Sequence, residues 1–252
     1  MIIVRYGELW TKSEFVRKRM IDKLTENIRD CYKRNGKKLD RIVKKRGRIL
    51  IYGEECPKLK NVFGIVSYSV AEEVDNIKEA ALRKYTGGTF RITTKRINKN
   101  YPKTSQEVNR EVGEYIVKHT GAKVDLEHPD VNIGIEIMDK AYIFNNEVKC
   151  YGGLPVGVTG HAYGLCEDEK GANACILMMR RGLRLSVYGE CANVLKEYDY
   201  GNPIKIVSRE EVLNARYKVV PWDFNKVNDI KPGVLAPLLG YLNLPFSIKC
   251  KS

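Results

Sequence analysis

Residues 91–105 carry cationic side chains at a spacing that suits the neutralisation of phosphate groups. The segment reads RITTKRINKNYPKTS, and its basic residues are Arg91, Lys95, Arg96, Lys99 and Lys103. The wider window 80–106 has seven basic residues and no carboxylate. Each cation can neutralise one phosphate and release its counterions, so four or five contacts would give a slope of log affinity against log salt of roughly −3 to −4. The segment therefore predicts polyanion binding.

The five cations cannot all point the same way if the segment begins as a strand. Alternate residues of a strand face opposite sides, so Arg91 and Lys95 share one face and Arg96 turns to the other. We therefore place Lys95, Arg96, Lys99 and Lys103 ahead of Arg91 as phosphate ligands. Tyr101 can stack on an unpaired base. The alternative for Tyr101 is a loop aromatic that covers the core.

A second cationic segment, Lys44-Lys45-Arg46-Gly47, is predicted to be the tip of a hairpin formed by strands at 39–43 and 48–52. It lies in the most basic part of the chain, because residues 1–60 carry 18 Lys and Arg against 8 Asp and Glu. Residues 61–160 carry 13 of each, and residues 161–252 carry 13 and 10. Lys44, Lys45, Arg46 and Arg48 are therefore further candidates for polyanion binding. The alternative is a solvated surface that only keeps the protein soluble.

The cysteines and histidines do not form a recognisable reactive or metal-binding pattern. The seven cysteines are odd in number, widely spaced and without a CxxC motif, which argues against a disulfide framework and a zinc site. We expect reduced thiols packed as small apolar groups. The three histidines have no cysteine or carboxylate at ligand spacing, so we expect no metal.

The composition is that of a soluble protein with a sizeable core. The chain has 252 residues, 43% of them hydrophobic and 30% charged, and a net charge of +13. This length favours two or three domains. The apolar runs are far shorter than the ~20 residues of a membrane span, and the N-terminus does not resemble a signal peptide. We expect a cytoplasmic protein, for which basic surfaces suggest a nucleic-acid partner.

The elements that must position these residues can be read from capping signals and periodicity. Capping boxes at Thr11–Glu14 and Thr104–Glu107 predict two helices, and the first has an apolar stripe through Met20, Leu24 and Ile28. The glycine-rich stretch 152–157 predicts a loop or domain boundary. Strand and helix patterns alternate after it, with strands at 162–166, 183–188 and 204–207 and helices at 171–181, 191–198 and 210–217. This order predicts an α/β region with a parallel sheet.

Three segments together resemble the tRNA 4-thiouridine synthetases (tRNA sulfurtransferases). RYGEL at 5–9, the basic helix and the hairpin strand RGRILIY resemble their N-terminal ferredoxin-like domain. FRITTKRINKNYPKTSQEVNREVGEYI (90–116), KVDLEHPDVNIGIEI (123–137) and GGLPVG (152–157) resemble their THUMP domain. The resemblance implies an α+β ferredoxin-like domain over 1–60, a THUMP domain over 61–160 and a smaller Rossmann-like α/β domain over 161–252.

The resemblance also implies a ligand, because in this family the THUMP domain binds the acceptor end of tRNA with help from the N-terminal domain. The cations of residues 91–103 would then face RNA phosphates. Gly152 and Gly153 would let the RNA backbone approach closely. Their alternative role is a tight turn that leaves the domain.

The resemblance fails at the segment that should bind ATP. In the family, GGLPVG leads to a PP-loop, SGGxDS, whose backbone amides hold pyrophosphate at a helix N-terminus. The corresponding residues here are Cys166, Glu167, Asp168, Glu169, Lys170 and Gly171. A carboxylate about 4 Å from a phosphate charge costs on the order of 4 kcal/mol at an effective dielectric near 20. We therefore expect these acids to cap the following helix, and we expect no ATP or other cofactor.

Three functions follow from these observations. The first is a tRNA-binding protein without adenylation activity of its own, whose C-terminal domain packs, forms a homodimer or recruits a sulfur-transfer partner. The second is a divergent tRNA sulfurtransferase that uses ATP through another loop or a second chain. The third is a basic module that binds RNA by charge alone. The apolar segment 234–246 is either an interface or the last core element.

Overall fold

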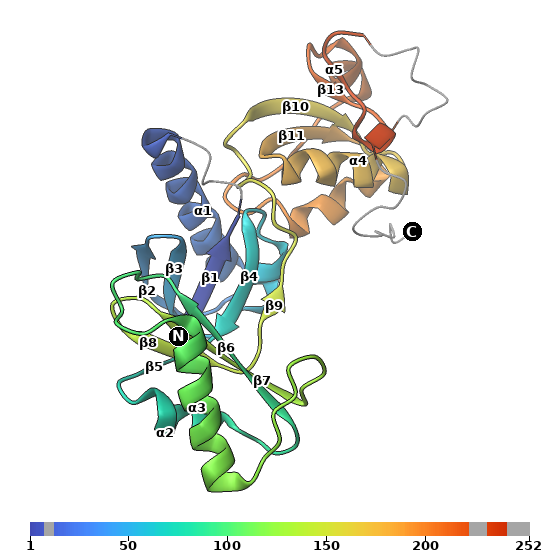
Figure 1. Cartoon of the computed structure of the whole chain (residues 1–252). Helices are drawn as coiled ribbons and strands as arrows, with labels where there is room; N and C mark the ends of the chain where they lie inside the picture. Colours follow the sequence, from blue (N-terminus) through green and yellow to red (C-terminus); the bar gives the residue numbers. More distant parts are fainter. Residues whose placement is uncertain (8–12, 222–230, 241–252) are drawn as a thin grey trace. The chain divides into compact units, whose positions relative to one another are not determined.

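The computed structural model describes residues 1–7, 13–221 and 231–240, and it divides into two compact units (Figure 1). The first unit contains Met1–Arg5, Leu39–Glu55 and Ser67–Lys149. The second unit contains Tyr6–Lys38, Cys56–Val66 and Cys150–Ser252. Each unit thus combines segments that are far apart in the sequence.

The first sheet has the strand order β2-β3-β1-β4-β9. Its strands are β1 (Ile2–Tyr6), β2 (Leu39–Lys45), β3 (Arg48–Gly53), β4 (Ile65–Val70) and β9 (Val148–Lys149). β2 and β3 form the predicted hairpin and pair as far as Lys45 and Arg48. Only Arg46 and Gly47 are left for the turn, where Gly47 has a φ of +75° that suits glycine.

The second sheet of the first unit has the order β5-β8-β7-β6. Its strands are β5 (Glu72–Val74), β6 (Phe90–Arg96), β7 (Val131–Ile137) and β8 (Ala141–Phe144). The helices α2 (Ile77–Lys84) and α3 (Ser105–Thr120) pack against this sheet through a core that includes Ala81, Val112 and Ile135. α3 begins with the predicted capping box, in which Thr104 and Glu107 exchange side-chain and backbone hydrogen bonds.

A buried ion-pair cluster joins the two sheets of the first unit. Glu136 of β7 is fully buried, and it accepts hydrogen bonds at 2.6 Å from Nε of Arg5 and Nε of Arg48. Arg5 also donates from Nη1 to Ser69 Oγ at 3.0 Å. Burial raises the pKa of Glu136, but the hydrogen bond from Arg48 and the charges of Arg5 and Arg48 outweigh burial and lower it.

The second unit begins with α1 (Glu14–Arg34) and the 3₁₀ helix η1 (Pro57–Asn61). α1 is capped by Ser13, whose hydroxyl accepts a hydrogen bond from the amide of Val16. The predicted cap Thr11 lies outside the described residues, and the helix starts later than we expected. The predicted stripe is confirmed, because Met20, Leu24 and Ile28 are buried.

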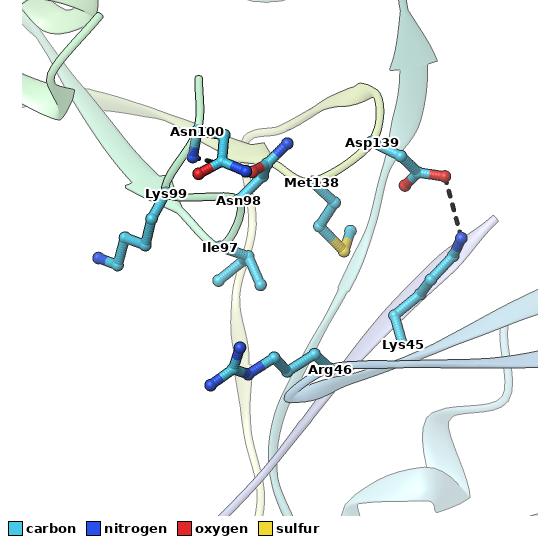
Figure 2. Close-up of a pocket in the computed structure, with 8 residues that line it drawn as sticks. All are labelled: Lys45, Arg46, Ile97, Asn98, Lys99, Asn100, Met138 and Asp139. Carbon is cyan, nitrogen blue, oxygen red and sulfur yellow. Dashed lines mark hydrogen bonds and ion pairs between the residues drawn. The ribbon is translucent and has the colours of Figure 1, made fainter. Parts of the chain in front are cut away.

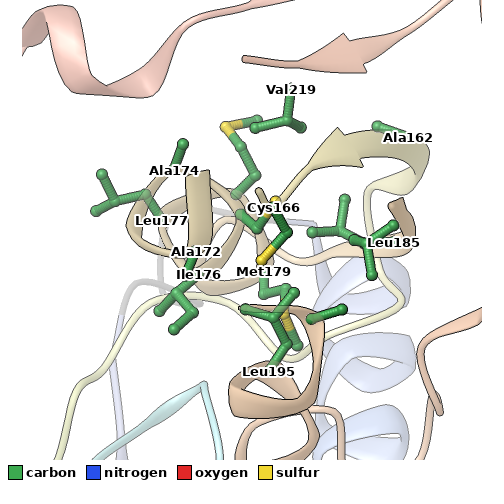
Figure 3. Packing of buried hydrophobic residues seen from close by; sticks show 14 of the residues in the cluster. Ala162, Cys166, Ala172, Ala174, Ile176, Leu177, Met179, Leu185, Leu195 and Val219 are labelled. Atoms are coloured by element: carbon green, nitrogen blue, oxygen red, sulfur yellow. The ribbon is translucent and has the colours of Figure 1, made fainter. Parts of the chain in front are cut away.

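The remainder of the second unit is a parallel sheet with the order β12-β11-β10-β13-β14. Its strands are β10 (Gly160–Leu165), β11 (Leu183–Tyr188), β12 (Lys205–Ile206), β13 (Lys218–Val219) and β14 (Val234–Leu235). The connections contain α4 (Glu169–Arg180), the 3₁₀ helix η2 (Glu190–Glu197) and α5 (Arg209–Asn214). Buried side chains of β10, α4, β11 and η2 form one core, as Figure 3 shows for Ala162, Ile176, Leu185 and Leu195. Of the segment 234–246, residues 241–246 lie outside the described residues.

The expected fold class is confirmed: the chain is α/β, with a mixed sheet formed by β5, β8, β7 and β6 and a parallel sheet at the end. Residues 191–198 were predicted as a helix, and the chain forms the 3₁₀ helix η2 there, over Glu190–Glu197. One local expectation was wrong. Cys191 was expected to be a reduced thiol, but it is disulfide-bonded. Cys31, Cys56, Cys166 and Cys175 are buried free thiols, as expected.

Among the described residues, no helix is long and apolar enough to cross a bilayer.

Candidate nucleic-acid interface

β6 and the loop after it position the cations of residues 91–99. Arg91 is held by its own unit, because Nη1 donates to the carbonyl of Leu126 at 2.8 Å. Arg96 is half-buried and donates from Nη1 to the carbonyl of Tyr101 at 3.2 Å. Lys95 and Lys99 are exposed, and neither forms an ion pair with any residue that the structure describes. Of the strand and its loop, these two lysines are therefore the most available to an anion.

The β2–β3 turn positions the second group of cations. Arg46 is exposed and makes no ion pair within the described part of the chain, while Nζ of Lys45 lies 2.9 Å from Asp139 Oδ2. Lys44 is also exposed. Arg48 turns inward to Glu136, and its guanidinium is thereby committed to the buried cluster. The turn thus presents Arg46 outward with Lys45 beside it.

The turn and the loop after β6 together line one cavity of about 360 Å³, which we call the basic cavity (Figure 2). Its lining residues are Lys45, Arg46, Ile97, Asn98, Lys99, Asn100, Met138 and Asp139. Figure 2 shows Arg46 and Lys99 projecting to the same side, whereas Lys45 turns toward Asp139. Two cationic segments separated by some fifty residues of sequence therefore meet at one surface hollow.

The basic cavity contains two residues that the sequence did not single out. Asn98 and Asn100 alternate with Lys99 in the loop, and Asn98 Oδ1 accepts a hydrogen bond from the amide of Asn100 at 3.0 Å. Amide side chains can donate and accept hydrogen bonds at RNA bases and sugars. The signal that could have revealed them is the interleaving of asparagine and lysine in INKN.

Tyr101 and Lys103 lie at a different hollow, of about 380 Å³, beside α2 and α3. Lys103 Nζ lies 2.6 Å from Glu111 Oε2, and this contact raises the pKa of Lys103. Tyr101 is half-buried and packs against the core of this sheet. This placement favours the core-covering role for Tyr101 over base stacking.

Gly152 and Gly153 lie in the second unit, and the protein's own backbone occupies the space beside Gly153. Gly152 donates to the carbonyl of Ile65 at 2.8 Å, and Leu154 donates to the carbonyl of Arg180 at 2.8 Å. Both glycines have positive φ, and a Cβ at Gly153 would collide with the carbonyl of Arg180. The contacts favour a tight turn against the end of α4.

The segment Cys166–Gly171 lies at the carboxyl end of β10, the position where parallel α/β sheets bind ligands. Asp168 caps α4, and its Oδ1 accepts a hydrogen bond from the amide of Gly171 at 2.7 Å. Glu167 Oε1 lies 3.0 Å from Nε of Arg209. Glu169 and Lys170 are exposed, and Cys166 is buried. Asp168 thus occupies the N-terminus of α4, and Glu167 lies beside it paired with Arg209.

The comparisons with known protein families divide the chain near residue 69. Residues 1–69 match the ThiI ferredoxin-like domain, and residues 69–145 match the THUMP domain. Both the β2–β3 turn and β6 with its loop fall within these matches, so the basic cavity is formed by residues of both domains.

Curated relatives match most of the chain. The probable tRNA sulfurtransferase of Thermococcus kodakarensis is 34% identical over 249 residues, covering 84% of this chain and 65% of that protein. The probable tRNA sulfurtransferase of Methanocaldococcus jannaschii is 37% identical over 258 residues, covering 91% and 65%. The chain therefore spans slightly less than two thirds of these relatives.

Two solved structures resemble the whole fold. PH1313 from Pyrococcus horikoshii has a TM-score of 0.81 and 32% identity, and the match covers 95% of this chain and 94% of that one. A 4-thiouridine synthetase in complex with RNA and bound ATP has a TM-score of 0.71 and 25% identity, with 95% and 81% covered.

Proposed function

The chain belongs to the tRNA sulfurtransferase family, and on this premise we propose that it binds tRNA through the basic cavity. The observation that carries the proposal is the pair Arg46 and Lys99, two exposed cations that line the same hollow. A phosphate placed between them would meet two positive charges that no described carboxylate neutralises. A tRNA partner also implies that the protein works in the cytoplasm.

Arg46 and Lys99 are the core of the proposed site, and Lys45 lines the same cavity. Lys44 and Lys95 are further exposed candidates on β2 and β6. Lys45 can exchange its exposed contact with Asp139 for a phosphate at small cost, because exposed ion pairs contribute only about 0–1 kcal/mol. Arg91, Arg96 and Lys103 already have partners and take a secondary place. Arg48 stays outside the site because moving it away would take one cationic partner from the buried carboxylate of Glu136.

The test compares tRNA binding by Arg46→Glu/Lys99→Glu with binding by the wild type over a range of salt concentrations. Losing two phosphate contacts should reduce the magnitude of the salt slope by about 1.5 and weaken binding roughly tenfold or more. Arg110→Glu/Lys118→Glu is the matched control, because both residues are exposed on α3 and the charge change is the same. Equal losses of tRNA affinity in the two double variants would mean that the protein binds RNA by its overall charge.

We further propose that the acceptor end of tRNA is the part recognised, as the family membership suggests. Removing the unpaired 3′ nucleotides should then weaken binding about tenfold or more, because each lost base contact is worth ~1–3 kcal/mol. An unchanged affinity for the shortened tRNA would contradict recognition of this end.

A divergent sulfurtransferase is the second candidate, favoured by the name that the relatives carry. The carboxylates of Cys166–Gly171 oppose it, because they stand where a phosphate would have to bind. An enzyme of this kind would release AMP and pyrophosphate when tRNA, ATP and a sulfur donor are present. We propose that the chain alone does not. A homodimer and a partner that supplies sulfur stay predictions.

A further inference from the structure

The parallel sheet of the second unit has one face covered by its main core, and among the described residues α5 is the helix that crosses the other face. The connections through α4 and η2 run in one direction across the sheet, from β10 to β11 and on to β12. The connection through α5 returns across the sheet to β13. Because parallel crossovers are right-handed, α4 and η2 lie on one face and the short α5 lies on the other. Ala162, Leu185 and Val187 point toward the α4 side, where they are buried.

The strand register gathers polar side chains on the α5 side. His161 is paired with Arg184, Tyr163 with Ser186, and Ser186 with Lys205, so their side chains share one face. Two contacts agree with this register: His161 Nε2 lies 3.0 Å from Ser186 Oγ, and the rings of His161 and Tyr163 are 4.9 Å apart. We call the area around His161, Arg184 and Lys205 the open face.

Among the described residues, the open face carries the cations Arg184 and Lys205 with no acid paired to either. His161, Arg184 and Lys205 are exposed, and within the described ranges none of them forms an ion pair. Burial, and then the nearby charges of Arg184 and Lys205, lower the pKa of His161, so the three groups are electrostatically close. On α5, Glu211 is held by Ser208 in the helix cap, and Glu210 makes no ion pair with the three. Like charges held together in this way are stabilised by a bound anion.

We propose that the open face binds phosphates of the RNA backbone, with Arg184 and Lys205 as the charged ligands and His161 beside them. The proposal rests on the proposed function, because it extends the contact of the same RNA to the second unit. His161 and Arg184 are the second residues of their strands and Lys205 pairs with Ser186 within β11, so the open face lies away from the carboxyl ends of the strands. It is therefore separate from the loop Cys166–Gly171 at the carboxyl end. A cationic sheet face suits a sugar–phosphate backbone, which offers repeated charge and needs no deep pocket.

The test measures tRNA binding by Arg184→Glu/Lys205→Glu at several salt concentrations. The salt slope should lose about 1.5 in magnitude, and the affinity should fall roughly tenfold. Lys205→Glu and Lys196→Glu form a matched pair, because Lys196 is an exposed lysine of the same unit on η2, which crosses on the α4 side. Lys196→Glu should bind as the wild type does, whereas Lys205→Glu should bind about threefold or more weakly. Arg184→Gln/Lys205→Gln is the control for misfolding caused by charge reversal. It should also lose tRNA affinity, but less than Arg184→Glu/Lys205→Glu.

The outcomes separate this inference from the proposed function. If the wild-type protein does not bind tRNA, both the proposed function and this inference are wrong. If Arg46→Glu/Lys99→Glu weakens tRNA binding but Arg184→Glu/Lys205→Glu does not, the proposed function stands and RNA binding by the open face is wrong.

A calorimetric titration with inorganic pyrophosphate distinguishes RNA from a free phosphate compound as the ligand. We expect no saturable binding at millimolar pyrophosphate. Submillimolar binding that is lost in Arg184→Glu/Lys205→Glu, combined with unchanged tRNA binding in that variant, would assign the face to free phosphate and overturn the proposal.

Discussion

The cations of the first unit differ in what their side chains must give up to reach a phosphate. Arg46 and Lys99 give up only water. Lys45 and Lys103 must leave exposed ion pairs with Asp139 and Glu111, which cost little to break. Arg48 must leave the buried Glu136, which would then keep Arg5 alone to compensate its charge. Ranking candidate ligands by this cost separates residues that look equivalent in the sequence.

The first prediction at this scale concerns Glu136. Glu136→Gln removes the negative charge that Arg5 and Arg48 share in the interior, so we expect the free energy of unfolding to fall by about 3 to 5 kcal/mol. Urea unfolding at neutral pH measures this change. Asp139→Asn is the control, because its ion pair with Lys45 is exposed and should be worth about 1 kcal/mol or less.

The same substitution has a pH signature. The folded-state pKa of Glu136 lies below the ordinary value of a glutamate, so the stabilisation is fully present above the unfolded pKa and is lost as pH falls through the folded pKa. The stability difference between the wild type and Glu136→Gln should therefore be constant near neutrality and shrink under acid. A difference that grows as the pH falls would contradict a charged Glu136.

At the scale of the elements, local signals predicted much of the chain. The Thr104–Glu107 box predicted the start of α3, and the strand pattern at 183–188 predicted β11. These succeed because capping and strand alternation involve residues that are close in sequence. The start of α1 was missed because Ser13 competes with Thr11 as a cap, and spacing alone favoured Thr11.

Alanine in place of the two glycines Gly113 and Gly121 of α3 should change the stability of the protein in opposite directions. Gly113 lies inside the helix, and an added Cβ would meet no atom within 4 Å, so Gly113→Ala should stabilise the protein by about 0.5–1 kcal/mol. Gly121 ends the helix with a φ of +71°, so Gly121→Ala should destabilise it by about 1 kcal/mol. Thermal or urea unfolding of the two variants measures both effects. Effects of the same sign would mean that one of these two backbone conformations is wrong.

At the scale of the whole molecule, the sequence could name the cationic residues but not their neighbours. The basic cavity depends on how β1, β3 and β7 are joined through Glu136, which no local pattern encodes. The open face depends on the register of three parallel strands, and a shift of one residue would turn its side chains to the other face. Both surfaces are products of long-range pairing, and this is why the composition gave only the charge and not the sites.

The last prediction concerns nucleotide binding by the complete chain. In the loop Cys166–Gly171, Asp168 already caps α4 and Glu167 is paired with Arg209, so an ATP phosphate would meet carboxylates where amides should be free. One such contact costs on the order of 4 kcal/mol, which is about a thousandfold in affinity. About 1 mM ATP with magnesium should therefore shift the melting temperature by less than ~1 °C, since stabilisation follows RT ln(1 + [L]/Kd). By reciprocity, ATP should also leave the tRNA affinity unchanged. The contrary result would be a melting temperature of the wild type that rises by several degrees with ATP, and that rises no further in Glu167→Gln/Asp168→Asn. It would mean that these carboxylates do not exclude the nucleotide.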